Sequence, residues 1–169
     1  SVISDASVTS VLTNAQYPKF ASDNNSLYYF DASNSSIMKV NLESTAAGSV
    51  ETIFDASTAL PTGAMYYVNN YDISKDGSIL LLQMYDDYSY RDNIYIIDIA
   101  NGMAGFDAGT SNITNFVDGT DPPSPYWIGN PKLSPDGEYV LFVTDSGGAN
   151  NIFVMRTDGR AVKWDEDGN

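Results

Sequence analysis

Acidic side chains in one short stretch are the strongest candidates for chemistry in this sequence. Residues 86–92 carry three carboxylates, with tyrosine and serine hydroxyls between them. Such hard oxygen ligands are the ones that Ca²⁺ prefers. The sequence therefore predicts a calcium site built from Asp86, Asp87 and Asp92. The alternative is a solvated hairpin tip in which Arg91 partly neutralises the acids.

Aromatic side chains form the second candidate site. The sequence has 12 tyrosines, and several of them fall in or beside predicted loops. A flat ring on a rigid scaffold buries a large area at a small entropy cost, which suits peptide or sugar recognition. The alternative is that these rings simply pack between strands. The candidate ligand-binding residues are Tyr85, Tyr88, Tyr90, Tyr126 and Trp127.

Composition excludes most catalytic chemistry. The chain has no histidine and no cysteine, so it cannot form imidazole bases, serine–histidine–aspartate triads, thiolate zinc sites or disulfides. Acid pairs that could serve a glycosidase are so numerous that none stands out. The glycine pattern of a phosphate-binding loop does not occur. We therefore expect no catalytic residue in this chain, and no cofactor other than calcium.

Net charge limits the partners. Eight Lys and Arg against 22 Asp and Glu give a net charge of −14, which repels nucleic acids and anionic membrane surfaces. The sequence contains no run of about 18 apolar residues, which is the length that a membrane-spanning helix needs. Hydrophobic residues make up 43% of the 169 residues, which is enough for the core of one folded domain. The expected partner is a protein, a peptide or a glycan.

Three similar segments determine the predicted architecture. They are 18–24, 71–77 and 131–137, and each is followed by two apolar runs and a weaker third run. The runs are short, rich in β-branched and aromatic residues, and bounded by turn formers, which is the pattern of strands and hairpins. No window has a sustained helical period, so no helix is predicted.

Four short strands in each repeated unit are typical of β-propeller blades. We therefore predict an all-β fold, a β-propeller of about three four-stranded antiparallel blades that form a partial ring. Residues 1–169 are taken as one domain, in which an extra strand at 7–13 precedes blade units at about 15–57, 64–118 and 126–165. The inner strands place three residues at equivalent positions that should be buried: Phe20, Ile73 and Leu133.

The aligned turns have a structural explanation. A turn needs a local side-chain acceptor, which aspartate supplies, and a residue that tolerates positive φ, which is glycine or, at Asn24, asparagine. Proline also presets φ at the second turn position. We therefore assign a structural turn motif to Asp23, Asp76, Gly77, Ser134, Pro135, Asp136 and Gly137.

Residues 131–160 resemble the TolB-type β-propeller repeat, which also occurs in prolyl-oligopeptidase-like peptidases. The resemblance rests on Pro-Lys-Leu-Ser-Pro-Asp-Gly at 131–137, Asn-Ile-Phe-Val-Met at 151–155 and Asp-Gly at 158–159. The second unit matches well, whereas the first has Ser22 and Asn24 in place of the motif's Pro and Gly. The resemblance implies a ring of six to eight blades, usually periplasmic or extracellular, that serves as a platform for binding proteins or ligands.

Two functions follow from the resemblance. The first is a non-catalytic binding or scaffold module that recognises a protein or other ligand through its blade loops. The alternative is the propeller domain of a larger hydrolase, whose catalytic domain would lie outside this chain. No Gly-x-Ser-x-Gly nucleophile motif occurs here, so the chain by itself is expected not to be an enzyme.

Three blades cannot close a ring. The terminal blades should therefore expose apolar residues, expected to be Tyr28, Phe30, Leu141 and Val143, which is uncommon for a soluble monomer. Ser1 at the start and the polar end at Asn169 favour a fragment with further blades in a parent chain. The alternative is self-association of two copies through their terminal blades into a six-bladed ring.

Overall fold

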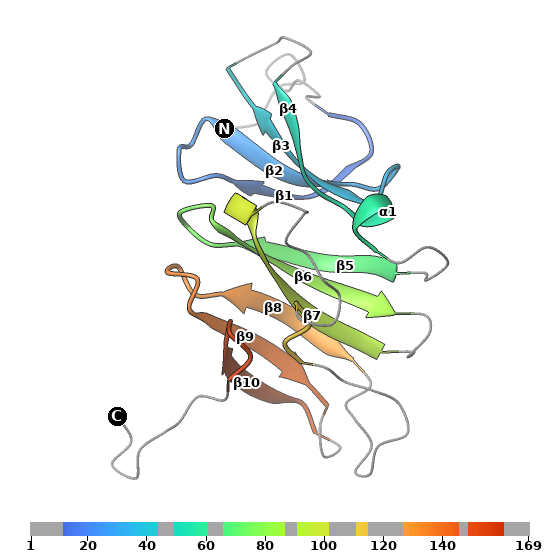
Figure 1. Ribbon diagram of the computed structural model, residues 1–169, viewed down its shortest axis with the longest axis vertical. Coiled ribbons are helices and arrows are strands. Elements are labelled where there is room, and N and C mark those ends of the chain that lie inside the picture. Colours follow the sequence, from blue (N-terminus) through green and yellow to red (C-terminus); the bar gives the residue numbers. More distant parts are fainter. Residues whose placement is uncertain are drawn as a thin grey trace, which may run out of the picture.

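The computed structural model describes residues 12–43, 49–60, 66–86, 91–101, 111–114, 127–145 and 149–160. These residues form ten strands, one short α-helix and one 3-10 helix. The strands build three antiparallel sheets that stack along the long axis of the molecule, from the N-terminal sheet to the C-terminal sheet (Figure 1). The predicted all-β fold of repeated antiparallel sheets is confirmed.

Each sheet comes from one repeated unit, and neighbouring strands in a sheet are neighbours in the sequence. This arrangement follows from the short turns, which leave each strand no partner nearer than the next one. The first sheet contains β1 (Ala15–Phe20), β2 (Ser26–Asp31), β3 (Ser36–Asn41) and β4 (Val50–Asp55). The second contains β5 (Tyr66–Ile73), β6 (Ile79–Asp86) and β7 (Arg91–Asp98), which the 3-10 helix η2 (Ile99–Asn101) follows. The third contains β8 (Ile128–Leu133), β9 (Tyr139–Thr144) and β10 (Asn151–Arg156).

The outermost strand differs between the units. In the first sheet, β4 is the predicted fourth strand. In the second unit an isolated antiparallel bridge joins Tyr95 to Asn112, where the fourth strand is predicted to begin. Residues 115–117 of that predicted strand, the predicted fourth strand of the third unit at 161–164 and most of the extra strand at 7–13 lie outside the described residues.

The prediction that the chain has no helix is wrong at residues 56–59. The helix α1 (Ala56–Ala59) is a single turn that follows β4. The Asp55 carboxylate begins it by accepting hydrogen bonds from the backbone N–H of Ser57 at 2.9 Å and from its hydroxyl at 2.6 Å, which is an N-cap. Four residues are too few to show a helical period in the sequence.

Two apolar cores lie between the sheets, and β6 contributes to both. Leu80 and Leu82 belong to the core between the first and second sheets, together with Tyr28 and Phe30. Leu81 points to the opposite face and belongs to the core between the second and third sheets. Because successive side chains of a strand point to opposite faces, a strand covered on both sides is apolar at consecutive positions. This burial explains the unbroken apolar run at the start of β6.

Burial at the equivalent positions of the inner strands differs from the prediction. Ile73 packs against the first core and Leu133 against the second, but Phe20 is 72% exposed. Each of these residues faces the sheet that precedes its own. Among the described residues no sheet precedes the first one, so nothing comparable covers Phe20. The prediction of three equally buried positions is therefore wrong for Phe20.

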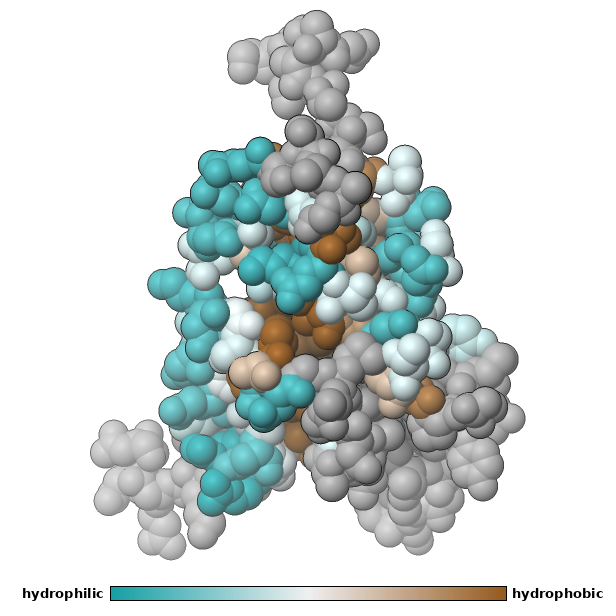
Figure 2. Space-filling model, turned by 45° about the horizontal axis from the view of Figure 1, so that its top comes forward, coloured by the Kyte–Doolittle hydropathy of each residue, from teal (hydrophilic) through white to brown (hydrophobic). Residues whose placement is uncertain are grey.

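The outer face of the third sheet carries the clearest exposed apolar surface. Leu141 pairs with Val154, and Val143 with Ile152, on the face opposite the second core. Leu141 is 45% exposed and Ile152 71%. On another side of the molecule, which Figure 2 shows with the end of the first sheet turned forward, hydrophobic residues reach the surface in a hollow bordered by hydrophilic residues. The terminal-face prediction is wrong for Tyr28 and Phe30, which point into the first core.

The first turn of each sheet has the same construction. In the second sheet, the Asp76 carboxylate accepts hydrogen bonds from the Ser74 hydroxyl at 2.7 Å and from the Ser78 N–H at 3.0 Å. Gly77 follows with a φ of 77°, and a Cβ there would lie 3.1 Å from the hydroxyl oxygen of Tyr28. Asn24 takes the equivalent position in the first sheet with a φ of 59°. The turns at 21–25, 74–78 and 134–138 lie along one edge of the molecule, at the left in Figure 1, which we call the turn edge.

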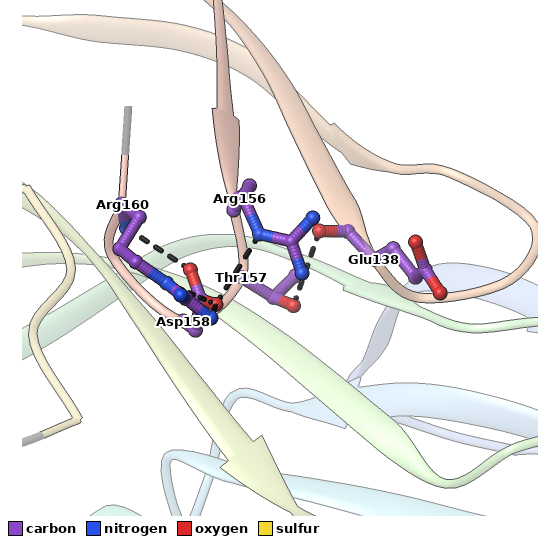
Figure 3. Close-up of polar contacts among 5 residues, drawn as sticks. All are labelled: Glu138, Arg156, Thr157, Asp158 and Arg160. Atoms are coloured by element: carbon purple, nitrogen blue, oxygen red, sulfur yellow. Dashed lines mark hydrogen bonds and ion pairs between the residues drawn. The ribbon is translucent and has the colours of Figure 1, made fainter. Parts of the chain in front are cut away.

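A further turn follows β10. Figure 3 shows the Asp158 carboxylate between two arginines, accepting from Arg156 Nε at 3.2 Å and from Arg160 Nε at 2.7 Å. The hydrogen bonds from Arg160 hold the pKa of Asp158 well below its usual range. Thr157 donates its N–H to the Glu138 carbonyl oxygen at 3.0 Å, which joins the end of β10 to the β8–β9 turn.

Acid is expected to destabilise the fold through these turns. Hydrogen bonds from Ser74 and Ser78 lower the pKa of Asp76 from 3.8 to about 2, and local hydrogen bonds lower the pKa of Asp23 and of Asp136. A carboxyl with a lowered folded-state pKa stabilises the fold above its unfolded pKa and loses that contribution as the pH falls through the folded value. The melting temperature should therefore fall between about pH 4 and pH 2.

The variant Asp76→Asn tests the contribution of this turn. It should melt below the wild type at neutral pH, and thermal scans should show the two melting temperatures converging as the pH approaches 2. Identical differences at both pH values would mean that the ionised carboxylate is not what stabilises the turn.

Candidate functional site

The described members of the predicted aromatic site lie at the edge opposite the turn edge, at the right in Figure 1. Tyr85 is near the end of β6, and Trp127 immediately precedes β8. The ring of Tyr67, near the start of β5, lies 6.4 Å from the ring of Tyr85, centroid to centroid. We call this the aromatic edge. The predicted residues Tyr88, Tyr90 and Tyr126 lie outside the described residues.

The backbone beneath Trp127 holds this side chain in a defined place. Its carbonyl oxygen accepts a hydrogen bond from the buried Thr144 hydroxyl at 2.9 Å. The next carbonyl, of Ile128, accepts from the buried Gln83 amide at 2.6 Å. A Cβ at Gly129 would lie 2.1 Å from the Trp127 ring atom Cζ3, so only glycine lets the ring lie against the strand. The backbone at Trp127 is thus held by two buried side chains, while the residue itself is 38% exposed.

Tyr67 is one of the tyrosines that the sequence places in or beside predicted loops, but it is not among the five candidate ligand-binding residues. Tyr67 is 49% exposed and is the repeat equivalent of Trp127, because both stand 9 residues before the aligned aspartates Asp76 and Asp136. That spacing is visible in the sequence. What it could not show is that the Tyr85 ring, from the neighbouring strand, lies beside Tyr67.

Only part of the predicted calcium site can be placed. Asp86 and Asp92 belong to the paired ends of β6 and β7, while Asp87 lies outside the described residues. One carboxylate oxygen of Asp92 accepts a hydrogen bond from the Asn69 side-chain amide at 2.8 Å. Among the described residues, no group of three acidic side chains is close enough to hold a metal ion. The calcium site therefore stays a prediction.

A row of charged side chains crosses the inner strands near the turn edge. Lys19, Asp72 and Lys132 occupy the same position in β1, β5 and β8. Lys19 Nζ lies 3.1 Å from Asp72 Oδ1, and the other Asp72 oxygen accepts from the Leu133 N–H at 3.0 Å. Desolvation lowers the pKa of Lys132, and the nearby Lys19 lowers it further. Asp72 thus links all three sheets electrostatically.

A cleft of about 580 Å³ opens beside this row, between the first and second sheets at the turn edge. Its walls carry three lysines, Lys19, Lys39 and Lys75, and apolar groups that include Tyr28 and Ile73. Ligand sites in proteins commonly have volumes of about 300–1,000 Å³. Sequence reasoning did not identify the cleft, because its lysines come from separate strands and a turn.

Comparisons with known proteins agree on the fold. The structure is similar to TolB from Acinetobacter baumannii, with a TM-score of 0.53 and 18% identity over 92% of this chain and 31% of that protein. It is also similar to an oligogalacturonate lyase from Vibrio parahaemolyticus, with a TM-score of 0.58 and 17% identity over 86% of this chain and 38% of the lyase. These identities show the fold alone, that of a β-propeller.

A third similar structure is the β-propeller domain of the Trilobed protease from Pyrococcus furiosus, with a TM-score of 0.54 and 11% identity. The match covers 92% of this chain and 43% of that domain. This chain therefore spans less than half the length of each of these three structures. No protein-family model matches the sequence, and no curated protein sequence matches it. Within the described residues, no helix is long and apolar enough to cross a membrane. The TolB-like propeller fold that the repeat predicts is confirmed.

Proposed function

We propose that this chain is a non-catalytic binding module of the TolB-like propeller type, which recognises a protein partner or another ligand through the aromatic edge. The observation that carries the proposal is the exposed Trp127, whose ring lies against Gly129 and whose backbone carbonyl, like that of Ile128, accepts a hydrogen bond from a buried side chain. A rigid, half-exposed aromatic ring loses little entropy when it is covered, so it is a favourable contact in recognition. The resemblance also suggests a periplasmic or extracellular location.

The position of the site supports this proposal. Tyr67, Tyr85 and Trp127 lie at the ends of strands that the sheet cores hold in place. Binding residues on such rigid scaffolds, with loops around them, are common in proteins. The segments 87–90 and 115–126, which carry the other predicted aromatic residues, connect to these same strand ends.

The second candidate function is that of a propeller domain in a larger hydrolase. Two proteins of similar fold are a dipeptidyl peptidase 4 from Porphyromonas gingivalis, of which this chain covers 19%, and the Trilobed protease. Both likenesses lie below 25% identity and support the fold only. In the hydrolase case the chain would control access to a catalytic domain elsewhere in a parent protein, and it would itself still be non-catalytic.

Binding through the aromatic edge is expected to depend on Trp127. We would select ligands for the wild-type chain from a displayed peptide library and from an immobilised oligosaccharide panel. Trp127→Ala should then weaken binding of the selected ligand by at least about tenfold, because aromatic residues at the centre of interfaces commonly contribute about 2 kcal/mol or more.

The matched control is Phe20→Ala, which removes an exposed ring near the turn edge. Affinity should be unchanged in this variant, with circular dichroism verifying that both variants fold. If no ligand is selected, or if both variants bind equally weakly, the aromatic edge is not the recognition site.

A further inference from the structure

The cationic side chains of this acidic chain are unevenly distributed. The sequence has only five lysines against 22 acidic residues. Lys19, Lys39 and Lys75 line the cleft at the turn edge, and Lys132 interacts with Lys19 beside it. Four of the five lysines therefore gather at one end of the interface between the first two sheets, on the side away from the aromatic edge.

The three aspartates of the cleft already form hydrogen bonds or ion pairs with other groups of the protein. Asp23 accepts from the N–H of Ser26 at 2.8 Å and from its hydroxyl at 2.9 Å. Asp76 holds its own turn through Ser74 and Ser78. Asp72 accepts from Lys19 and from the Leu133 N–H. Their oxygens are therefore largely satisfied within the protein.

The lysines, in contrast, have donors to spare, because each ammonium carries three N–H groups. Within the part of the chain that the structure describes, Lys19 has one ion pair, with Asp72. Lys39 Nζ lies 5.5 Å from the centroid of the Tyr28 ring, a contact that uses no hydrogen-bond acceptor. No hydrogen bond or ion pair of the Lys75 side chain occurs among the described residues. The cleft is close to neutral in formal charge but has an excess of hydrogen-bond donors.

The excess of hydrogen-bond donors favours a ligand that has many hydrogen-bond acceptors. A metal cation would face three ammonium groups, and a neutral ligand would leave them unsatisfied. An anion whose charge is spread over several carboxylates can satisfy separate lysines, while its carbon skeleton contacts Ile73. A compact phosphate concentrates its charge at one point, where the cleft's aspartates oppose it.

We propose that the cleft between the first and second sheets binds a small polycarboxylate through Lys19, Lys39 and Lys75. The carboxylates come from a small organic acid, or from acidic side chains presented by a peptide, and both sources share this chemistry. The proposal is independent of the proposed function, because the two sites lie at opposite edges of the sheets and share no residue.

The test is calorimetric titration of the full chain with citrate, with a penta-glutamate peptide and with pyrophosphate. Citrate is expected to bind, and Lys39→Gln combined with Lys75→Gln should weaken its binding about tenfold or more, because the double variant removes two of the three charged donors to the carboxylates. If the peptide binds and citrate does not, the carboxylates come from a peptide, and the proposal that the ligand is a small organic acid is overturned. Tighter binding of pyrophosphate than of either carboxylate overturns the preference for carboxylates.

Two further variants separate a built site from general charge attraction. Arg160→Gln removes a positive charge outside the cleft and should leave citrate affinity unchanged. Asp72→Asn removes the negative partner of Lys19 and should strengthen citrate binding about threefold, a modest fraction of a charge interaction. Equal weakening in Arg160→Gln and in the double lysine variant, or weaker binding in Asp72→Asn with the fold intact, would contradict the proposal.

Discussion

Replacing Tyr71 by alanine is expected to lower the free energy of unfolding by about 3–5 kcal/mol, the usual cost of truncating a large buried aromatic side chain. Tyr71 is fully buried in the core between the first and second sheets. Its hydroxyl donates to the Tyr17 carbonyl oxygen at 2.7 Å, and Lys19 Nζ lies 5.6 Å from its ring centroid. Burial raises the pKa of this hydroxyl, so it remains a donor at all physiological pH values. This one side chain joins β5 to β1.

Two variants divide the expected loss into its causes in urea or guanidinium unfolding experiments. Tyr71→Phe keeps the ring and removes only the donor to Tyr17, and it should cost about 1–3 kcal/mol. Phe20→Ala removes an exposed ring from the adjacent strand and should change stability by no more than about 0.5 kcal/mol. If Phe20→Ala proved as costly as Tyr71→Ala, the sheets would not be packed as described.

The isolated chain is expected to self-associate, with the outer face of the third sheet docking on the outer face of the first sheet of a second copy. The argument is the internal repeat. Leu81 is fully buried against the third sheet, whereas its equivalent Leu141 is 45% exposed. Phe20, on the first sheet, holds the position that Ile73 and Leu133 use to pack on the preceding sheet. Neighbouring sheets pack in the same way twice within the chain. The outer faces of the third and first sheets correspond to the two sides of that interface.

Sedimentation experiments from low to high micromolar concentration should show this association, and Ile152→Lys should abolish it by placing a charge on the exposed apolar face. Tyr67→Lys makes the same change at the aromatic edge and should have no effect. Docking would bring Lys132 of one copy near Lys19 of the other, so added salt should strengthen association by screening the repulsion. A stable wild-type monomer at high concentration would contradict the prediction.

Much of the fold could be predicted from local features of the sequence. Strand positions follow from short β-branched and aromatic runs between turn formers, as at Ile79–Leu82, and this signal needs no tertiary context. The turn at 74–78 is equally local, because Asp76 and Gly77 supply an acceptor and a positive φ within a few residues. The single-turn helix at Ala56–Ala59 escaped prediction because its only signal is the cap at Asp55.

Side-chain burial at the ends of the stack could not be predicted in the same way. Phe20, Ile73 and Leu133 look equivalent in the sequence, and only the stacking of the sheets distinguishes the exposed Phe20 from the packed Ile73. Tyr28 was assigned to an outer face for the same reason, although it lies in the first core. Burial depends on which sheet lies next to a residue, and that is a property of the assembly of sheets.

The sequence by itself determined the repeat, the strands, the turns and the limits that composition places on chemistry, since each of these depends on residue types at short spacing. The tertiary structure alone decided which side chains from different strands meet. Lys19 and Asp72 are 53 positions apart in the sequence but 3.1 Å apart in space, and Lys75 reaches the same cleft from a turn. A binding site is a set of long-range contacts, and such contacts exist only once the sheets have stacked.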